Sequence, residues 1–341
     1  MQRRMMTLTL ALGLALMMVS SAAMAQFKLT NLVSNQVGKA VHVDPQLVNA
    51  WGLVYAPGSP WWVSDQASGW STLYNRFGAK QGLEVAVPSA NGKGTGQPTG
   101  IVFNGAPEFK VSGSPGVFLF ATLDGTISGW APSVNPNAAI IAVNNSNAGA
   151  QYTGLAITSH ASGNFLYAAD SANNKVDMYD ATFTWVSSFT DPTVPAGFAT
   201  FNVQDLDGLL YVTFAAQNGG PGGFVDIFSE SGVWLKRLTE GGPLNQPWGL
   251  AAAPSDFGAL SNTLLISNNV SGNGTINGFN AITGDFVGPV RQNGKPIHID
   301  QVWGIGFGGG NANSGAKNEL FFTAGPSGNL AGTFGVIRVS Q

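Results

Sequence analysis

The sequence contains no cysteine, and this absence limits the chemistry that the chain can perform. Without thiols it can form no disulfide scaffold, no cysteine-ligated zinc site or iron–sulfur cluster, and no cysteine nucleophile. Charge is also scarce, because 10% of the 341 residues are Asp, Glu, Lys or Arg, against about 25% in a typical soluble protein. The 15 basic residues form no stripe that could neutralise phosphates. We therefore expect no nucleic-acid partner.

The N-terminus has the organisation of a secretory signal peptide. Arg3 and Arg4 precede an apolar run over residues 8–19, and the small residues that follow end at Ala25. This run is shorter than the roughly 20 residues that a membrane-spanning helix needs. We expect residues 1–25 to be a signal peptide cleaved near Ala25. The mature protein is then predicted to be secreted, either periplasmic or extracellular, with no membrane span.

The rest of the chain repeats with a period of about fifty residues, and periods of this length are typical of propellers and solenoids. A unit begins with a polar residue, two further residues, a glycine and an apolar stretch, as in Gln246-Pro-Trp-Gly249-Leu-Ala. Asn202 takes the place of this glycine in one unit. The anchor glycines of the other units are Gly52, Gly100, Gly154, Gly249 and Gly304.

Each unit continues with two more short apolar stretches bounded by Gly, Asn, Asp or Pro, which predicts antiparallel strands. Helical periodicity is nearly absent. Six such units predict an all-β fold, a single six-bladed β-propeller over residues 26–341. The sixth unit is one strand short, so residues 27–34 are expected to supply its outer strand and close the ring. An open solenoid is the competing architecture, but the sequence shows no polar capping units for one.

Two resemblances accompany this pattern. Residues 166–180, with Tyr-Ala-Ala-Asp, an Asn-Asn turn and Val-Asp-Met-Tyr-Asp, are similar to an NHL-type propeller repeat. The signatures at 30–34, 44–49, 120–130 and 322–326 resemble an uncharacterised family of secreted bacterial β-propeller proteins, some of which carry PEP-type C-terminal sorting segments. The resemblance implies the fold and export, and it leaves the activity open.

Polar side chains at the start of the first strands are the candidate ligand-binding residues. They would lie near one mouth of the central channel, where they either bridge neighbouring blades or present amides to a polar ligand. The candidates are Asn49, Gln97, Gln151, Asn202, Gln246 and Gln301.

Other recurring residues have structural interpretations. We expect Asp65, Asp170 and Asn268 to hold turns by accepting backbone hydrogen bonds. Three tryptophans that precede anchor glycines are expected to pack between blades. They are Trp51, Trp248 and Trp303.

Two His-x-Asp triplets, His42–Asp44 and His298–Asp300, precede the first strands of units one and six, which ring closure makes neighbours. Alternation in an extended segment places His and Asp of each triplet on one side. Four such side chains at the channel mouth would suit one divalent ion, Zn²⁺ or Mn²⁺ rather than Ca²⁺. The competing interpretation is that Asp44 begins a turn before Pro45 and that the histidines are solvated.

The sequence contains no recognised catalytic motif, and whether the protein is an enzyme stays open. We favour a non-catalytic ligand- or protein-binding module, expected to be monomeric, whose partner is a polysaccharide, a small molecule or a cell-surface protein. The alternative is a metal-dependent hydrolase of the lactonase or calcium-dependent phosphotriesterase type, with Asn202, Gln204 and Asp205 at the channel. Because polar groups gather where the first strands begin, we expect the site on that face, between blades six and one.

Overall fold

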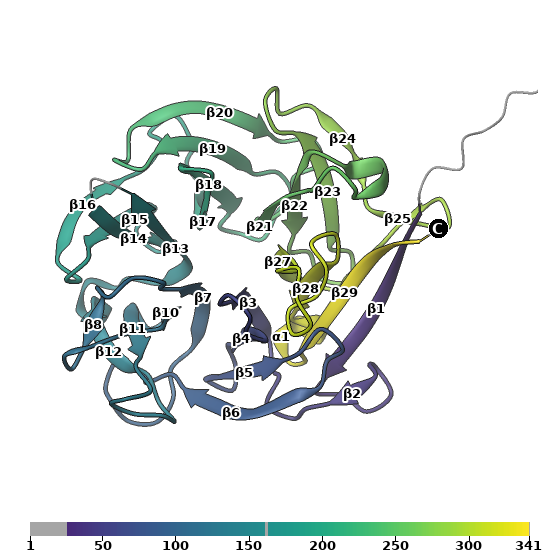
Figure 1. The fold of residues 1–341 in the computed structure, drawn as a ribbon. Helices are drawn as coiled ribbons and strands as arrows, with labels where there is room; N and C mark the ends of the chain where they lie inside the picture. The colour runs from purple at the N-terminus through teal and green to yellow at the C-terminus, as the bar shows by residue number, and fades with distance from the viewer. Residues whose placement is uncertain (1–25, 161–162, 341) are drawn as a thin grey trace, which may run out of the picture.

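The computed structural model describes residues 26–160 and 163–340, which form a six-bladed β-propeller. Each blade is a twisted sheet of four or five strands, and the blades surround a central channel (Figure 1). No helix in the described part of the chain has the length and apolar character needed to cross a bilayer. The expected signal peptide, residues 1–25, lies outside the described residues.

The blades follow one another along the chain, and each one begins at the channel and ends at the outside. Blade 1 contains β3 (Ala50–Tyr55), β4 (Trp61–Asp65), β5 (Trp70–Tyr74) and β6 (Lys80–Ala86). Blade 2 contains β7 (Pro98–Phe103), β10 (Phe118–Thr122), β11 (Thr126–Trp130) and β12 (Ile140–Asn144). Blade 3 contains β13 (Tyr152–His160), β14 (Gly163–Asp170), β15 (Lys175–Asp180) and β16 (Trp185–Phe189).

The second half of the chain continues the same order. Blade 4 contains β17 (Phe198–Leu206), β18 (Leu209–Ala216), β19 (Phe224–Ser229) and β20 (Trp234–Glu240). Blade 5 contains β21 (Pro247–Ala252), β22 (Thr263–Asn268), β23 (Thr275–Asn280) and β24 (Phe286–Pro289). Blade 6 contains β27 (Val302–Phe307), β28 (Leu320–Ala324), β29 (Thr333–Ser340), β1 (Gln26–Ser34) and the short β2 (His42–Val43).

Several short elements lie in the connections between these strands. They are the hairpins β8 (Lys110–Val111) with β9 (Ser114–Pro115) and β25 (Arg291–Gln292) with β26 (Lys295–Pro296), the 3₁₀ turns η1 (Ser146–Ala148) and η2 (Gly258–Leu260), and the four-residue α1 (Pro326–Asn329).

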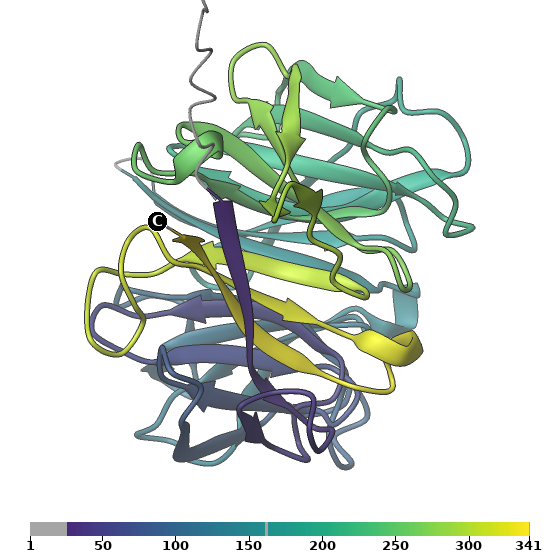
Figure 2. The same ribbon diagram turned by 90° about the vertical axis from the view of Figure 1, so that its right-hand side faces the viewer.

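The N-terminal strand closes the ring, as the sequence predicted. Strand β1 pairs antiparallel with β29 from Gln26 opposite Ser340 to Ser34 opposite Thr333, and Figure 2 shows the two strands side by side. Each of the inner strands β3, β7, β13, β17, β21 and β27 contacts the inner strands of both neighbouring blades. The solenoid alternative is therefore wrong, because the first and last blades are joined and leave no open end.

The anchor glycines allow this close contact between inner strands. A Cβ atom at Gly52 would collide with the backbone oxygen of Thr99 in the next blade, and one at Gly100 would collide with the backbone nitrogen of Leu155. In blade 4, Asn202 stands in the glycine position, and its side chain fills the space beside Gly154. The repeat recognised in the sequence is thus a steric requirement of the narrow ring.

Candidate functional site

Three tryptophans close the channel near the ends at which the inner strands begin. Trp51 and Trp303 stack with ring centroids 3.5 Å apart, and Trp248 packs edge-on against both at 6.2 and 6.0 Å. Leu123 and Phe201 complete the cluster, which therefore draws on five of the six blades. We expected these rings to pack between blades, but they pack against one another across the channel. We call this group the tryptophan cluster.

Two features of the chain fix the orientation of these rings. The residue two positions before each tryptophan has a left-handed backbone, with φ of 49° at Asn49, 53° at Gln246 and 49° at Gln301. Two of the indole N–H groups are also fixed, since Trp303 donates to Asn49 Oδ1 at 2.9 Å and Trp248 donates to the oxygen of Thr153 at 3.0 Å. The cluster is therefore held rigidly between the two faces of the propeller.

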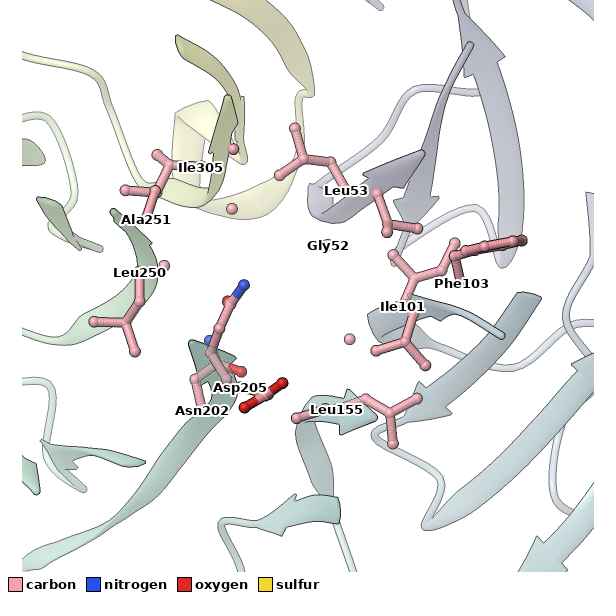
Figure 3. Close-up of a pocket in the computed structure, with 18 of the residues that line it drawn as sticks. Gly52, Leu53, Ile101, Phe103, Leu155, Asn202, Asp205, Leu250, Ala251 and Ile305 are labelled. Atoms are coloured by element: carbon pink, nitrogen blue, oxygen red, sulfur yellow. The ribbon is translucent and has the colours of Figure 1, made fainter. Parts of the chain in front are cut away.

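On the far side of this cluster lies a cavity of about 650 Å³, which we call the channel cavity. Its wall is formed by the inner strands of all six blades from the anchor glycine onward, so it belongs to the face at which the inner strands end. The sequence led us to expect the site on the opposite face. Figure 3 shows Asn202 and Asp205 on one wall and apolar side chains on the others, including Leu53, Ile101 and Ile305.

Of the described residues that line the channel cavity, Asp205 alone bears a charged side chain. Its Oδ1 accepts a hydrogen bond from the Gly208 amide at 3.1 Å, at the turn that follows the strand. Asn202 and Gln204 on the same strand add carboxamides, and burial raises the pKa of Tyr55, which keeps that phenol neutral. The described lining of the cavity is therefore largely apolar, with one carboxylate on the blade 4 wall.

Three of the predicted amide residues, Asn49, Gln97 and Asn202, take part in hydrogen bonds that join neighbouring blades. Asn49 donates to Gln66 and Gln66 donates to Gln97, both at 2.7 Å, so these side chains join blades 1 and 2. Asn202 Nδ2 donates to the oxygen of Trp248 at 2.8 Å and joins blades 4 and 5. These contacts support the interpretation of the amides as bridges between blades.

Gln151, Gln246 and Gln301 lie at the equivalent positions of blades 3, 5 and 6. Gln246 donates to the oxygens of Ala216 and Gly220 in blade 4. Gln301 accepts from the Asn329 amide at 3.1 Å, within blade 6. Gln151 and Gln246 also line a second, smaller pocket.

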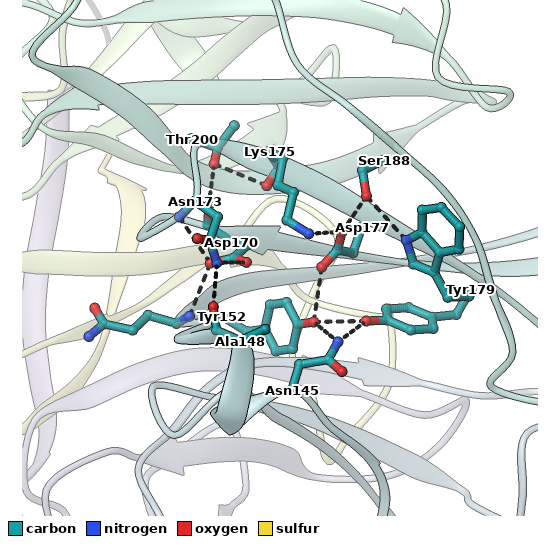
Figure 4. A network of polar contacts seen from close by, with 12 residues as sticks. Asn145, Ala148, Tyr152, Asp170, Asn173, Lys175, Asp177, Tyr179, Ser188 and Thr200 are labelled. Atoms are coloured by element: carbon teal, nitrogen blue, oxygen red, sulfur yellow. Dashed lines mark hydrogen bonds and ion pairs between the residues drawn. The ribbon is translucent and has the colours of Figure 1, made fainter.

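All three of the expected turn-holding residues accept hydrogen bonds, but of the backbone bonds seen here only one lies within the expected turn, where the Asn173 amide donates to Asp170 at 3.3 Å. Asp170 accepts from the Gln151 amide at 3.0 Å and from the Asn173 side chain at 2.7 Å (Figure 4). Asn268 accepts from the Asn245 amide at 3.0 Å. Asp65 instead accepts from the Thr72 hydroxyl at 2.7 Å, and burial raises the pKa of Asp65 well above its usual range.

Figure 4 also shows a buried polar network that the sequence did not suggest. The hydroxyls of Tyr152 and Tyr179 lie 2.7 Å apart, and Tyr152 donates to Asp177 at 3.0 Å. Asn145 donates to both hydroxyls at 2.7 Å, and Lys175 forms an ion pair with Asp177 at 2.8 Å. Because these groups satisfy one another between blades 2 and 3, the network is structural.

The structure does not gather the predicted metal ligands. Asp44 is buried, accepts from the Tyr74 hydroxyl at 2.6 Å and pairs with Lys80 at 2.8 Å. His42 is exposed on β2, beside Gly78. Asp44 is thus held by neighbours within blade 1.

The histidine and the aspartate of the second triplet, His298–Asp300, lie in different surroundings. Asp300 accepts from the Gly272 amide at 2.5 Å and the Ser327 amide at 2.9 Å, so it joins two loops. His298 is exposed between the buried Ile297 and Ile299. Among the side chains that the structure describes, no three His, Asp or Glu residues form a group able to hold a metal ion.

The fold and the channel cavity define a six-bladed β-propeller with a plugged channel, and comparison with known proteins places it in a family. The chain is 30% identical to the uncharacterized protein R648 of Acanthamoeba polyphaga mimivirus, in an alignment that covers 94% of this chain and 82% of that protein. It is also 30% identical to the uncharacterized protein L690 of the same virus, with 83% and 79% covered. The chain therefore belongs to the family of these proteins. These relatives are viral, whereas the sequence motifs led us to expect a bacterial family.

Solved structures share the fold at low sequence identity. A streptogramin B lyase structure matches with a TM-score of 0.55 and 11% identity over 92% of this chain and 97% of that chain. A protein of unknown function from Bacteroides thetaiotaomicron matches with 0.55 and 10% over 92% and 76%. The virginiamycin B lyase from Staphylococcus aureus matches with 0.52 and 14% over 87% and 82%. No family model matches the chain.

Proposed function

We propose that this protein is a ligand-binding module whose channel cavity takes a largely apolar small molecule that carries one cationic or hydrogen-bond-donating group. The observation that carries the proposal is the wall of the cavity, in which apolar side chains from all six blades face a single carboxylate, Asp205. Concave, mostly apolar cavities of about 300–1,000 Å³ with a few polar groups are typical small-molecule sites.

The chemistry of the wall selects the ligand. The apolar residues stabilise a hydrocarbon or aromatic body through loss of its hydrated surface. An ammonium group placed beside Asp205 would form a charge-assisted hydrogen bond, whereas a carboxylate there would be repelled. The ligand is therefore expected to be amphipathic, with its polar end toward blade 4.

The hydrolase alternative has weaker support at this cavity. Asn202, Gln204 and Asp205 supply oxygen atoms from one strand, but they include only one carboxylate. Ca²⁺ usually takes about six to eight oxygen ligands, several of them from carboxylates. The donor set of the cavity is thus better suited to a polar contact with an organic ligand than to a cation.

The test uses three molecules with the same body: 4-phenylbutylamine, 4-phenylbutanol and 4-phenylbutyrate. We expect the amine to bind about tenfold more tightly than the alcohol, equivalent to about 1.4 kcal/mol, and the acid to bind most weakly. Titration calorimetry measures this order, and a change in tryptophan fluorescence, to which Trp61 and Trp248 in the lining contribute, reports occupancy.

Two matched variants complete the experiment. Asp205→Asn should remove the preference for the amine while the alcohol still binds. Asp207→Asn changes an exposed carboxylate two residues away, outside the cavity lining, and should leave the order unchanged. Equal affinity of the amine and the acid for the unmodified protein would contradict the proposal.

We also propose that the module is exported after cleavage near Ala25. The first described strand begins at Gln26, whose side-chain oxygen accepts from the Gly294 amide at 3.1 Å. A cut after Ala25 would therefore leave every residue of the closing strand in place. N-terminal sequencing of the protein recovered from a secretion-competent host tests this, and a start at Met1 in the exported protein would contradict it.

A further inference from the structure

The row of amide side chains at the starts of the inner strands is interrupted in blade 4. Five blades carry Asn or Gln three residues before the anchor position, at Asn49, Gln97, Gln151, Gln246 and Gln301. Blade 4 has Ala199 at this place, three residues before Asn202. The alanine side chain is too short to reach a neighbouring blade, so a gap forms between the amides of blades 3 and 5.

A pocket of about 380 Å³ occupies this gap, and we call it the side pocket. Gln151 of blade 3 and Gln246 of blade 5 line it together with Ala199 itself. Phe201, which also belongs to the tryptophan cluster, forms part of its wall. The side pocket therefore lies on the face where the inner strands begin, across the cluster from the channel cavity.

The polar groups of the side pocket are neutral. Its described lining includes Ser171, Thr200 and Gln217 but no Asp, Glu, Lys, Arg or His. Gln217 is exposed, and its backbone amide donates to the Gly197 oxygen at 2.8 Å, which fixes the turn that carries it. Gln151 is also exposed. Two solvent-facing carboxamides thus line the side pocket.

We propose that the side pocket is a binding site for a neutral sugar residue, such as the end of a glycan chain. A carboxamide both donates and accepts hydrogen bonds, which matches the dual character of sugar hydroxyls. The lack of charge in the lining disfavours phosphates, carboxylates and amines, whose charges would lose hydration without a partner. Ala172 and Ala215 in the lining add apolar surface beside these groups.

This site is independent of the proposed function of the channel cavity, because the tryptophan cluster separates the two. The probes are the methyl glycosides of glucose, galactose, mannose and N-acetylglucosamine, observed by saturation-transfer NMR with the full mature chain. We expect at least one of them to bind and methyl glucuronide, which is charged, to bind more weakly. The blocked amino acid N-acetylalanine methylamide tests the rival occupant, a peptide.

The decisive variant is Ala199→Gln, which restores in blade 4 the residue type that other blades carry. It should fill the pocket and abolish the sugar signal; because Ala199 is 4% exposed, the fold of the variant is checked by circular dichroism before the NMR measurement. The matched control is Ala252→Gln, which places the same side chain in the lining of the channel cavity and should leave the sugar signal intact.

A second pair of variants keeps the proposal testable if Ala199→Gln does not fold. Gln151→Ala and Gln217→Ala remove exposed side chains and should each weaken binding about two- to tenfold, the effect of one lost hydrogen bond. The proposal is overturned if no methyl glycoside binds, if a folded Ala199→Gln protein keeps the full signal, or if N-acetylalanine methylamide binds and the sugars do not.

Discussion

The closing strand β1 should contribute far more to stability than its position at the edge of a blade suggests. Its side chains enter two different cores: Phe27 packs in the cluster between blades 5 and 6, and Leu32 and Val33 pack in the cluster between blades 6 and 1. The ring of Phe27 is 3% exposed and lies 4.8 Å from the ring of Phe257. Loss of this strand would therefore loosen both neighbours of blade 6.

The magnitude follows from the burial of Phe27. Truncation of a buried phenylalanine to alanine typically costs about 3–5 kcal/mol. In a protein of this size, 1 kcal/mol lowers the thermal midpoint by roughly 1.5 °C. Phe27→Ala should thus lower the midpoint by about 5–8 °C, measured by circular dichroism and by urea unfolding. The reference is Phe77→Ala, because Phe77 is 59% exposed, and it should cost less than about 1 kcal/mol.

Removal of residues 27–34 extends the same test. The deletion takes away the buried side chains of this strand, including Ser34, and leaves the edge of β29 unpaired, so we expect a protein that no longer folds cooperatively. Deletion of the loop 91–96, whose residues are mostly exposed, should cost much less. Equal midpoints for the two deletions, or for Phe27→Ala and Phe77→Ala, would refute the idea that the ring is held closed by β1.

Three further predictions concern buried groups of the inner and third strands. Trp303→Phe should abolish the exciton couplet that the stacked Trp51 and Trp303 rings produce in circular dichroism, and an unchanged couplet would contradict the stacking. Burial raises the pKa of Asp226 to about 7. The folded protein therefore keeps a proton on this carboxyl that the unfolded chain releases near pH 4. The free energy of unfolding should consequently fall as the pH rises from 4 to 7. The Asp226→Asn variant should not show this fall, which is measured as the urea midpoint at several pH values between 4 and 7. Asn202→Ala should lower stability by about 1–3 kcal/mol because the buried oxygen of Trp248 loses its donor, and an unchanged urea midpoint would contradict this.

The architecture could be predicted from sequence because its steric requirements recur in every blade. Anchor glycines such as Gly52 and Gly100 are fixed by collisions between inner strands, and such a constraint leaves a visible period. The closing strand could also be predicted, since the sixth unit is one strand short. These features depend on backbone geometry, and a backbone constraint that recurs in each blade appears in the sequence as a repeat.

The site could not be predicted in the same way, because it depends on where side chains meet. The pattern of His42 and His298 suggested convergence, but each histidine is exposed and each neighbouring aspartate is hydrogen-bonded to other residues. The tryptophan cluster left a signal in the pattern Asn/Gln-x-Trp-Gly of three blades. Its meaning depends on the left-handed backbone at residues such as Asn49, which the sequence alone does not reveal.

The sequence of blade 4 carries a signal that is more useful for locating the proposed sites. It departs from the repeat twice, with Asn202 in place of glycine and Ala199 in place of an amide. The first departure lies on the strand that carries Asp205, the charged group of the channel cavity, and the second opens the side pocket. In a closed ring, residues that match the repeat are constrained by their neighbours, so a blade that breaks the pattern is free to shape a cavity. Both proposed sites therefore include residues of blade 4, because a ligand needs space and polar groups that the repeat itself does not supply.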